Sequence, residues 1–472
     1  MLFNSLEFIL FFIVVTAVYF FLPHRYRWFH LLAASCYFYM AFVPVYILIL
    51  GGTIVVDYFA GLWIEKTEGT NRKLLLILSL AANIGVLAVF KYYNFFVENI
   101  NELGFRFSFL KILLPIGLSF HTFQAMSYTI EVYRGNQKAE KHFGIYALYV
   151  MFYPQLVAGP IERPQHMLHQ FYEKHEFDAD EFFIGFKMML WGMFKKVVIA
   201  DRLAIMVNTV YSYPQNYNST MLLLATVFFS VQIYCDFSGY SSIAIGAAKV
   251  MGFKLMTNFN KPYEARSIDE FWKRWHISLS TWFRDYLYIP LGGNRVRIPR
   301  WYLNLFIVFI ISGLWHGANW TFIIWGALHG FYLVLSIITK NARTQLDKLL
   351  HFEKGSRLHT FLQVAITFSL VTLAWIFFRS ESVNDSFYII KKIFSNNWGP
   401  LQEHITFSKF SYILSILLIA FLFIAENRIV DKIIFLKLSE QYKRSVAFGV
   451  IIMMMILVLG IFQNLAFIYF QF

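Results

Sequence analysis

The chain has 472 residues, of which 58% are hydrophobic and only 15% are charged, and its formal net charge at pH 7 is +13. Because soluble proteins carry about 25% charged residues, this composition excludes an ordinary soluble globular domain. Apolar stretches of about 20 residues recur along the chain, and each can cross a hydrocarbon core about 30 Å thick. The stretches are continuous rather than alternating, so they predict an all-α polytopic membrane bundle and not a porin-like barrel.

The positive charges lie mostly in short loops between the apolar stretches, which is the positive-inside pattern of membrane proteins. Such cations attract anionic lipid head groups, so membrane lipids are expected partners. No basic stretch resembles a nucleic-acid-binding module, and we expect no nucleic-acid partner. Cys36 and Cys235 both lie in apolar surroundings and predict neither a disulfide framework nor a metal cluster.

About 11 to 13 membrane segments are expected, with some short segments that are re-entrant or interfacial. The first is predicted to be a retained span rather than a cleaved signal, because it contains Glu7 and lacks a basic start. Without repeats or a low-complexity linker, residues 1–472 are predicted to form a single integral domain. The candidate spans are 5–22, 28–50, 51–64, 74–90, 112–130, 143–158, 182–200, 219–235, 238–252, 302–314, 319–339, 360–378, 408–425 and 446–468.

The polar segment that begins at Ser267 has the pattern of an amphipathic helix, which Pro290 and Gly292–Gly293 are expected to close. Ser267 and Glu270 form a capping box, and Asp269–Lys273 and Glu270–Arg274 are acid–base pairs four residues apart. One face is rich in aromatic residues at helical spacing, which predicts a helix in the membrane interface. This face contains Trp272, Trp275, Leu279, Trp282 and Tyr286.

His276 adjoins this aromatic face and allows two interpretations. It is either an interfacial histidine bonded to a backbone carbonyl, or a polar group at the mouth of a site for an acyl donor. In the second interpretation, Lys273, Arg274 and Arg284 would meet the phosphates of the donor. Contacts with lipid head groups and ion pairs with neighbouring acids are the alternative for these three cations.

His316 lies within an apolar stretch, where a histidine is costly and is by default a candidate functional residue. It is either a core histidine bonded to another helix or a general base, because a neutral imidazole can take a hydroxyl proton. His329 lies 13 residues later and would project about 140° away on a straight helix, so the two are not predicted to share zinc. Gly313 and Gly317 would allow a neighbouring backbone to approach closely.

Asp236 and Ser238 interrupt another apolar region. A buried Asp needs a partner, so Asp236 either ties helices together through nearby hydroxyls or orients a histidine or substrate. Arg379, at the end of a further apolar stretch, is expected to extend to the membrane interface. A nucleotide-hydrolysing pump is not supported, since the chain has no phosphate-binding glycine loop and no nucleophile-elbow serine.

The chain resembles the membrane-bound O-acyltransferases, in the bacterial branch that contains alginate and peptidoglycan O-acetyltransferases. The resemblance covers about 110 to 380 and rests on these stretches: FWKRWHISLS at 271–280, WFRDYLYIPLGGN at 282–294, WHGANW at 315–320, DFSGY at 236–240 and GPIERP at 159–164.

This resemblance implies a multi-helix bundle with a central tunnel that joins a cytoplasmic donor site to an outward acceptor. His316 matches the family's catalytic histidine, and His276 matches its second signature position, which is asparagine in many eukaryotic members. No metal and no bound cofactor are implied. Further candidates at the donor site or tunnel are Trp315, Asn319, Asp236, Ser238, Lys273, Arg274, Trp282, Arg284 and Asp285.

The expected activity is transfer of an acetyl group from acetyl-CoA, or another acyl thioester, to an exported polysaccharide. The expected location is the bacterial cytoplasmic membrane, with an extracytoplasmic SGNH-hydrolase-like acetyltransferase as partner. Two alternatives stay open. One is transfer of D-alanine from a carrier protein to teichoic acid, and the other is a lipid or glycan transporter, although no inverted repeat is visible.

Overall fold

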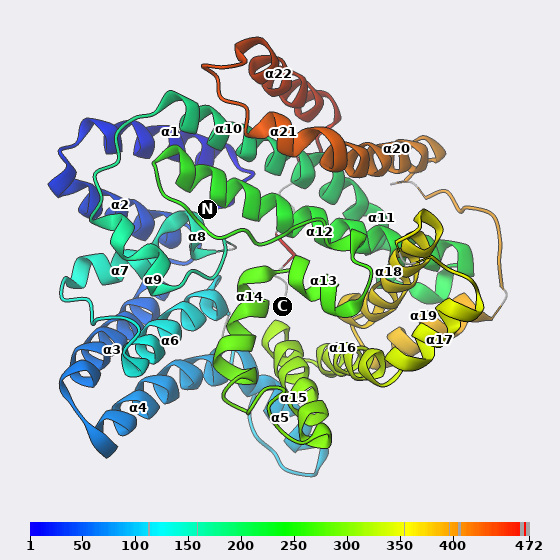
Figure 1. Ribbon diagram of the computed structural model, residues 1–472, viewed down its shortest axis with the longest axis horizontal. Helices are drawn as coiled ribbons and strands as arrows, with labels where there is room; N and C mark the ends of the chain where they lie inside the picture. Colours follow the sequence, from blue (N-terminus) through cyan, green and yellow to red (C-terminus); the bar gives the residue numbers. More distant parts are fainter. Residues whose placement is uncertain are drawn as a thin grey trace. The chain divides into compact units, whose positions relative to one another are not determined.

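Helices joined by loops make up the computed structural model of the chain (Figure 1). It describes residues 1–111, 114–157, 159–353, 355–395, 397–404, 407–462 and 467–468. Within these residues the only β pairing is an isolated bridge between His404 and Phe407. The predicted all-α architecture is therefore confirmed. The expected spans 112–130, 143–158 and 446–468 each include some residues that lie outside the described ranges.

The helices fall into two compact units, and each is described by itself. The first unit comprises Met1–Lys196, Gly239–Met256 and Asp431–Gln471, and the second comprises Val197–Ser238 and Thr257–Val430. Two elements contribute residues to both units, namely η4 (Phe194–Ala200) and α12 (Ser219–Val250). The prediction of a single integral domain stays a prediction.

In the first unit, α3 packs against α4 and α6, and α2 packs against α7 (Figure 1). Its elements are α1 (Leu6–Phe21), α2 (His24–Met40), η1 (Pro44–Tyr46), α3 (Ile47–Lys66), α4 (Gly69–Leu87), η2 (Ala88–Tyr92), α5 (Tyr93–Glu102), α6 (Leu118–Arg134), α7 (Phe143–Met151), α8 (Tyr153–Leu156), α9 (Pro164–Met167), η3 (His169–Phe171), α10 (Ala179–Met193), α21 (Asp431–Ile434) and α22 (Tyr442–Leu459).

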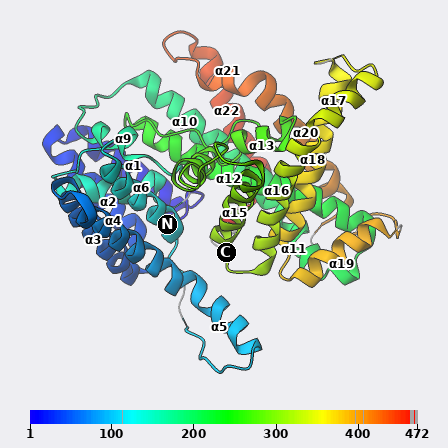
Figure 2. The ribbon, with the colours of Figure 1, turned by 60° about the horizontal axis from the view of Figure 1, so that its bottom comes forward.

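In the second unit, α16 packs between α15 and α18, and α13 also contacts α16 (Figure 2). Its elements are α11 (Asp201–Ser212), η5 (Pro214–Asn216), η6 (Pro262–Glu264), α13 (Ile268–Arg274), α14 (Ile277–Phe283), η7 (Arg284–Tyr288), α15 (Ile298–His316), α16 (Trp320–Ile338), α17 (Lys340–Leu349), α18 (Arg357–Arg379), α19 (Val383–Phe394), α20 (Lys409–Ala425) and η8 (Glu426–Val430).

Among the described residues, eight helices are long and apolar enough to cross a bilayer, so the chain is a multi-pass membrane protein. The expected 11 to 13 segments also counted shorter stretches, such as α1 with 16 residues. The eight helices are Pro44–Lys66, Gly69–Glu102, Ser219–Val250, Ile298–His316, Trp320–Ile338, Arg357–Arg379, Lys409–Ile434 and Tyr442–Leu459.

The expected spans 219–235 and 238–252 are a single helix, α12, of 32 residues. The polar residues between them do not end the helix, because Asp236 and Ser238 are buried within the protein. Gly239 continues the helix and serves close packing, since a Cβ atom there would lie 2.8 Å from the carbonyl oxygen of Gly192 in α10. The polar residues therefore alter the contacts of α12 with its neighbours, while its backbone stays helical.

The boundary expected near residue 50 is also wrong. The chain leaves helical conformation at 41–43 and begins the next helix at Pro44, while Gly51 and Gly52 lie within α3. A proline favours the first turn of a helix and disfavours helical conformation in the residue before it. Proline therefore sets this boundary, and the glycine pair does not.

The continuous amphipathic helix expected from 267 to 290 is broken into α13, α14 and the π-helical turn η7. The break falls at Trp275 and His276, where His276 has a left-handed backbone with φ 44° and ψ 55°. Trp272, Trp275 and Trp282 are buried in protein contacts rather than exposed at a membrane interface. Aromatic side chains gain more contact area in the protein interior, so tertiary packing overrides the helical periodicity.

α15 and α16 approach closely at Gly313, as predicted, but the partner glycine is Gly326 of α16. Gly317 lies just after α15, where a Cβ atom would meet the Phe322 ring and not a backbone. A Cβ atom at Gly313 would lie 2.2 Å from the carbonyl oxygen of Phe322, and one at Gly326 would lie 2.2 Å from that of Phe309. Backbone atoms cannot move aside as a flexible side chain can. The close contact between α15 and α16 therefore requires glycine, which has no Cβ atom, at both positions.

We expect Gly313→Ala to lower the thermal midpoint of the detergent-solubilised protein, because overpacking of this kind costs about 1–3 kcal/mol. Gly85→Ala is the matched control, since Gly85 lies in helix α4 with nothing within 4 Å of its Cβ position. The control should keep or raise the midpoint through better helix propensity. Equal midpoints for the two variants would show that the α15–α16 contact does not limit stability.

Candidate active site

Two of the histidines singled out from the sequence lie near the same tryptophan in the second unit. His316 is the last residue of α15, and His276 precedes the first turn of α14. The ring centroid of Trp315 lies 4.9 Å from that of His316 and 6.3 Å from that of His276. Residues 40 positions apart in the chain therefore share one indole neighbour.

The His316 imidazole is buried, with 3% of the residue exposed. Its ring centroid lies 5.0 Å from Trp325 of α16 and 5.3 Å from Phe378 of α18. We call Trp315, Trp325 and Phe378 the aromatic box. Walls of this kind exclude water, which protects a reactive acyl group from hydrolysis.

His276 is fully buried and adopts the left-handed conformation, which costs a non-glycine residue about 1–3 kcal/mol. Its backbone carbonyl accepts a hydrogen bond from Ser280 N–H at 2.9 Å and so begins α14. The ring lies perpendicular to that of Phe237, 4.6 Å away. The ring is therefore enclosed by protein, and the interfacial position considered from the sequence stays a prediction.

The ionisation of His276 is also constrained by its surroundings. The residue lies outside the eight membrane-spanning helices, between α13 and α14. Burial lowers the pKa of its imidazole to about 3, because the charged form loses hydration. The ring is accordingly neutral at physiological pH.

Asn258 is a site residue that the sequence did not indicate. It lies in the loop after α12, is fully buried, and its Oδ1 lies 3.1 Å from His276 Nδ1. The same oxygen accepts hydrogen bonds from Ser278 Oγ at 2.9 Å and Ser278 N–H at 3.3 Å. The contact with Asn258 Oδ1 therefore helps to hold the His276 ring. A lone asparagine 18 residues upstream carries no local signal for such a role.

Asp236 and Ser238 are both buried on α12, where they flank Phe237 in sequence. Phe237 is the member of this trio whose ring contacts His276. The DFSGY stretch therefore reaches the site through its aromatic residue. The roles suggested for Asp236 and Ser238 stay predictions.

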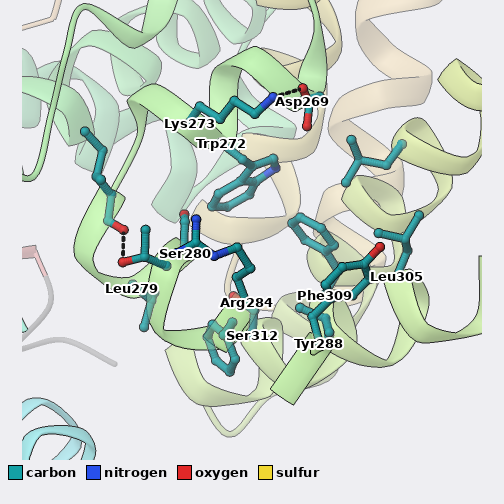
Figure 3. A pocket seen from close by; sticks show the side chains of 15 residues that line it. Asp269, Trp272, Lys273, Leu279, Ser280, Arg284, Tyr288, Leu305, Phe309 and Ser312 are labelled. Carbon is teal, nitrogen blue, oxygen red and sulfur yellow. Dashed lines mark hydrogen bonds and ion pairs between the residues drawn. The ribbon is translucent and has the colours of Figure 1, made fainter. Parts of the chain in front are cut away.

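A pocket of about 470 Å³ opens in the second unit between α13, α14, η7, α15 and α16 (Figure 3). In the close-up, Trp272 of α13 and Phe309 of α15 meet across it, with ring centroids 5.1 Å apart. Leu305, Phe309 and Ser312 contribute one face of α15 to the pocket. His316 follows Ser312 by four residues, about 6 Å of helix rise. The pocket therefore follows the helix that ends at His316.

The predicted cations lie near this pocket but already have acidic partners. Lys273 Nζ lies 2.5 Å from Asp269, Arg274 lies 2.7 Å from Glu270, and Arg284 Nε lies 2.8 Å from Asp285. Lys273, Arg284 and Asp269 line the pocket, as Figure 3 shows, whereas Arg274 and Asp285 do not. The ion pairs that the sequence offered as an alternative role for these cations are therefore formed. Ion pairs this exposed contribute little stability.

The capping interactions of α13 confirm the predicted start of the helix. Ser267 Oγ accepts a hydrogen bond from Glu270 N–H at 3.2 Å. The Glu270 carboxylate reaches back to Arg266 N–H at 2.8 Å, one residue before the expected partner. These contacts fix the first turn of the helix that carries Trp272 to the pocket.

His329 belongs to a different helix from His316, so the straight-helix comparison made from the sequence does not apply. Gly317–Asn319 ends α15 before α16 begins. His329 Nδ1 accepts a hydrogen bond from Trp272 Nε1 at 3.2 Å, and Trp325 lies 5.0 Å from both His316 and His329. The described residues contain no group of three potential metal-binding side chains.

Trp282 and Arg379, which the sequence also singled out, both contact other side chains of the protein. Trp282 is buried against Phe283 and Tyr286, with ring centroids 5.6 and 5.1 Å away. Arg379 donates a hydrogen bond to Asn208 Oδ1 at 2.7 Å and lies over the Tyr211 ring, so protein groups hold its guanidinium.

The GPIERP stretch lies in the first unit, where the buried Glu162 carboxylate accepts a hydrogen bond from Met256 N–H and lies 2.6 Å from His166 Nδ1.

Asn319 caps α16 through its Oδ1, which accepts a hydrogen bond from Thr321 N–H at 3.0 Å, and its Nδ2 donates to the carbonyl of Glu381 at 3.2 Å. This geometry explains the asparagine in WHGANW as a helix cap beside the histidine. A direct role toward a donor stays a prediction.

The comparisons with known proteins agree with this site. The family model for membrane-bound O-acyltransferases matches residues 138–379. This range includes α12, His276 and His316. The chain belongs to the membrane-bound O-acyltransferase family, and it is an acyl-transferring enzyme.

Three relatives illustrate the range of similarity. The probable alginate O-acetylase of Pseudomonas aeruginosa is 40% identical, over 85% of this chain and 76% of the relative. The peptidoglycan O-acetyltransferase of Helicobacter pylori is 37% identical, over 76% of this chain and 72% of the relative. The teichoic acid D-alanyltransferase of Bacillus subtilis is 28% identical, over 56% of this chain and 69% of the relative.

We expect Asn319→Ala to lower the free energy of unfolding by about 1 kcal/mol through loss of the cap. Asn319→Ser keeps a capping oxygen and should restore both the thermal midpoint and the acyl-transfer activity. Thermal unfolding and activity are to be measured in parallel on the two variants. Loss of activity in a fully stable Asn319→Ser protein would contradict a capping role and support contact with a substrate.

Proposed function

We propose that this enzyme transfers an acetyl group from a cytoplasmic thioester, preferably acetyl-CoA, to hydroxyl groups of an exported or cell-surface polysaccharide. The support is the identity of 36 to 40% with proteins named as alginate O-acetylases and of 37% with one named as a peptidoglycan O-acetyltransferase. The observation that carries the proposal is the pair of buried histidines around Trp315.

In the proposed reaction, His316 is the general base. The acceptor hydroxyl oxygen attacks the carbonyl carbon of the thioester while the imidazole takes the hydroxyl proton. The tetrahedral intermediate then expels the thiolate as the C–S bond breaks, and the thiolate takes up the proton that His316 accepted, which restores the neutral base. The aromatic box supports this assignment because it keeps water, the competing nucleophile, away from the acyl group.

The pocket beside α15 is proposed to receive the thioester arm of the donor. Its apolar lining suits an extended chain, and Lys273 and Arg284 offer positive charge near its mouth. These cations would exchange their carboxylate partners for the donor phosphates. Ser312, four residues before His316, is the last residue of α15 that lines the pocket.

The proposal includes a tunnel between the donor and the outward acceptor, and a location in the bacterial cytoplasmic membrane. An extracytoplasmic SGNH-hydrolase-like acetyltransferase would complete transfer to the sugar where the acetyl group does not pass directly. Support for the membrane location comes from the eight apolar helices.

A second candidate is transfer of D-alanine to teichoic acid. It is favoured by the 28% and 30% identity with two proteins named as teichoic acid D-alanyltransferases. Lower identity and shorter coverage place it behind acetyl transfer. The lipid or glycan transporter considered from the sequence is set aside, because the chain belongs to a family of acyltransferases.

The test is mass spectrometry of cell-surface glycans from cells that carry the wild-type gene, no gene, or His316→Ala. We expect acetyl esters in the wild type and a loss of about 10²- to 10⁴-fold in transfer rate for His316→Ala, because general-base help has this magnitude. The amount of folded His316→Ala protein in the membrane should stay near that of the wild type.

His169→Ala is the matched control, because His169 is an exposed histidine of the first unit. It should leave the acetyl content unchanged. D-alanyl esters in place of acetyl esters would move the assignment to the second candidate. Normal acetylation by His316→Ala would overturn the assignment of the base.

A further inference from the structure

The hydrogen bonds around His276 constrain which of its ring nitrogens carries the proton. His276 Nδ1 lies 3.1 Å from Asn258 Oδ1, and both residues are fully buried. Which His276 nitrogen carries the proton therefore depends on whether the oxygen or the NH₂ group of the Asn258 amide faces the ring. An oxygen there requires a proton on Nδ1, whereas an NH₂ group would require a lone pair.

The backbone of Ser278 decides the orientation of the amide. Ser278 N–H can only donate, and it points to Asn258 Oδ1 at 3.3 Å. The Ser278 hydroxyl donates to the same oxygen at 2.9 Å. A rotated amide would set its NH₂ against a backbone N–H, so the oxygen must face both Ser278 and His276.

The backbone path holds Asn258 beside His276 as well. Ile277 N–H donates to the carbonyl of Asn258 at 2.9 Å, and Asn260 N–H donates to that of Arg274 at 2.9 Å. These bonds tie the loop after α12 to the junction of α13 and α14. The left-handed conformation of His276 is therefore held in place by partners on both sides of the junction.

We propose that Asn258 is a positioning residue that fixes His276 as the Nδ1–H tautomer, so that Nε2 presents its lone pair to a hydroxyl group of a substrate. This inference rests on the proposed acyl transfer and deepens it. His276 is then a hydrogen-bond acceptor for the hydroxyl-bearing acceptor or for the hydroxyl that relays the acyl group. It cannot polarise the thioester carbonyl, because that task needs an N–H donor at Nε2.

The environment of the ring agrees with this role. Protonation would give Nε2 a hydrogen and reverse its role, but burial lowers the pKa of His276 to about 3. The rings of Phe237, Phe259 and Trp315 lie 4.6, 6.5 and 6.3 Å from the His276 ring, so its surroundings are largely aromatic. Titratable residues adjoin these contacts in the sequence, among them Asp236 beside Phe237, Arg274 two residues before His276, and His316 beside Trp315.

The tautomer is measurable without any substrate, by ¹⁵N NMR of the full-length protein with labelled histidine. The His276 signals are assigned by their loss in His276→Gln. We expect a protonated Nδ1 and an unprotonated Nε2 in the wild type, and a mixture of tautomers in Asn258→Ala. A wild-type Nε2–H signal would overturn the proposal even if acyl transfer is established.

Activity supplies the second readout. Asn258→Ala should lower kcat by about 10- to 100-fold, the range that follows removal of a partner that orients a metal-binding imidazole. Asn260→Ala, an exposed asparagine two positions on, is the matched control and should behave as the wild type. Thermal unfolding of each protein separates loss of orientation from loss of fold.

Asn258→Asp distinguishes an acceptor from a donor through its pH profile. A carboxylate keeps a bond with Nδ1–H but raises the pKa of His276, so the imidazolium forms at higher pH than in the wild type. If Nε2 accepts, activity of Asn258→Asp falls as pH decreases through that raised pKa. Activity that instead rises over the same range would show that His276 acts as a donor and would overturn the proposal.

These results fail separately from the proposed function. Absence of acyl transfer by the wild-type protein would remove the reaction but leave the tautomer measurement intact. Normal transfer with an unchanged kcat and an unchanged tautomer in a folded Asn258→Ala protein would leave the reaction and remove the role of Asn258.

Discussion

The close contact between α15 and α16 is the constraint on which the site in the second unit depends. Gly313 and Gly326 let the two backbones touch, and this contact places Trp325 of α16 against His316 at the end of α15. A wider helix pair would leave the imidazole accessible to water. Packing density at two glycines thus sets the environment of the proposed base.

Hydrogen-bond partners then give two equally buried histidines different properties. His276 and His329 are both fully buried, but Asn258 Oδ1 faces Nδ1 of the first, while Trp272 Nε1 donates to Nδ1 of the second. In the neutral rings these neighbours favour opposite tautomers. At Nε2, His276 is therefore assigned as a hydrogen-bond acceptor and His329 as a hydrogen-bond donor.

The aromatic residues around the site serve more than membrane anchoring. Trp315 links His276 with His316, and Trp272 joins the wall of the pocket to His329. Such rings fill space without competing for the polar groups of a substrate. They also keep water out while leaving the apolar pocket open along α15.

The sequence by itself determined the membrane class, the helical architecture, the family resemblance and the identity of the two principal histidines. Hydropathy and short motifs are local properties, so they are readable without a fold. Local pairs, such as the cap at Ser267 and the bond from Lys273 to Asp269, were predictable for the same reason.

Only the tertiary structure decided the break at His276, the continuity of α12 through Asp236, and the role of Asn258. Each depends on partners far away in the chain or on burial, which periodicity does not encode. The helical pattern of Trp272, Trp275 and Leu279 predicted one helix, but hydrogen bonds from the loop after α12 stabilise a left-handed residue in its middle. Long-range contacts outweighed local propensity there because they satisfy buried polar groups that a continuous helix would leave without partners.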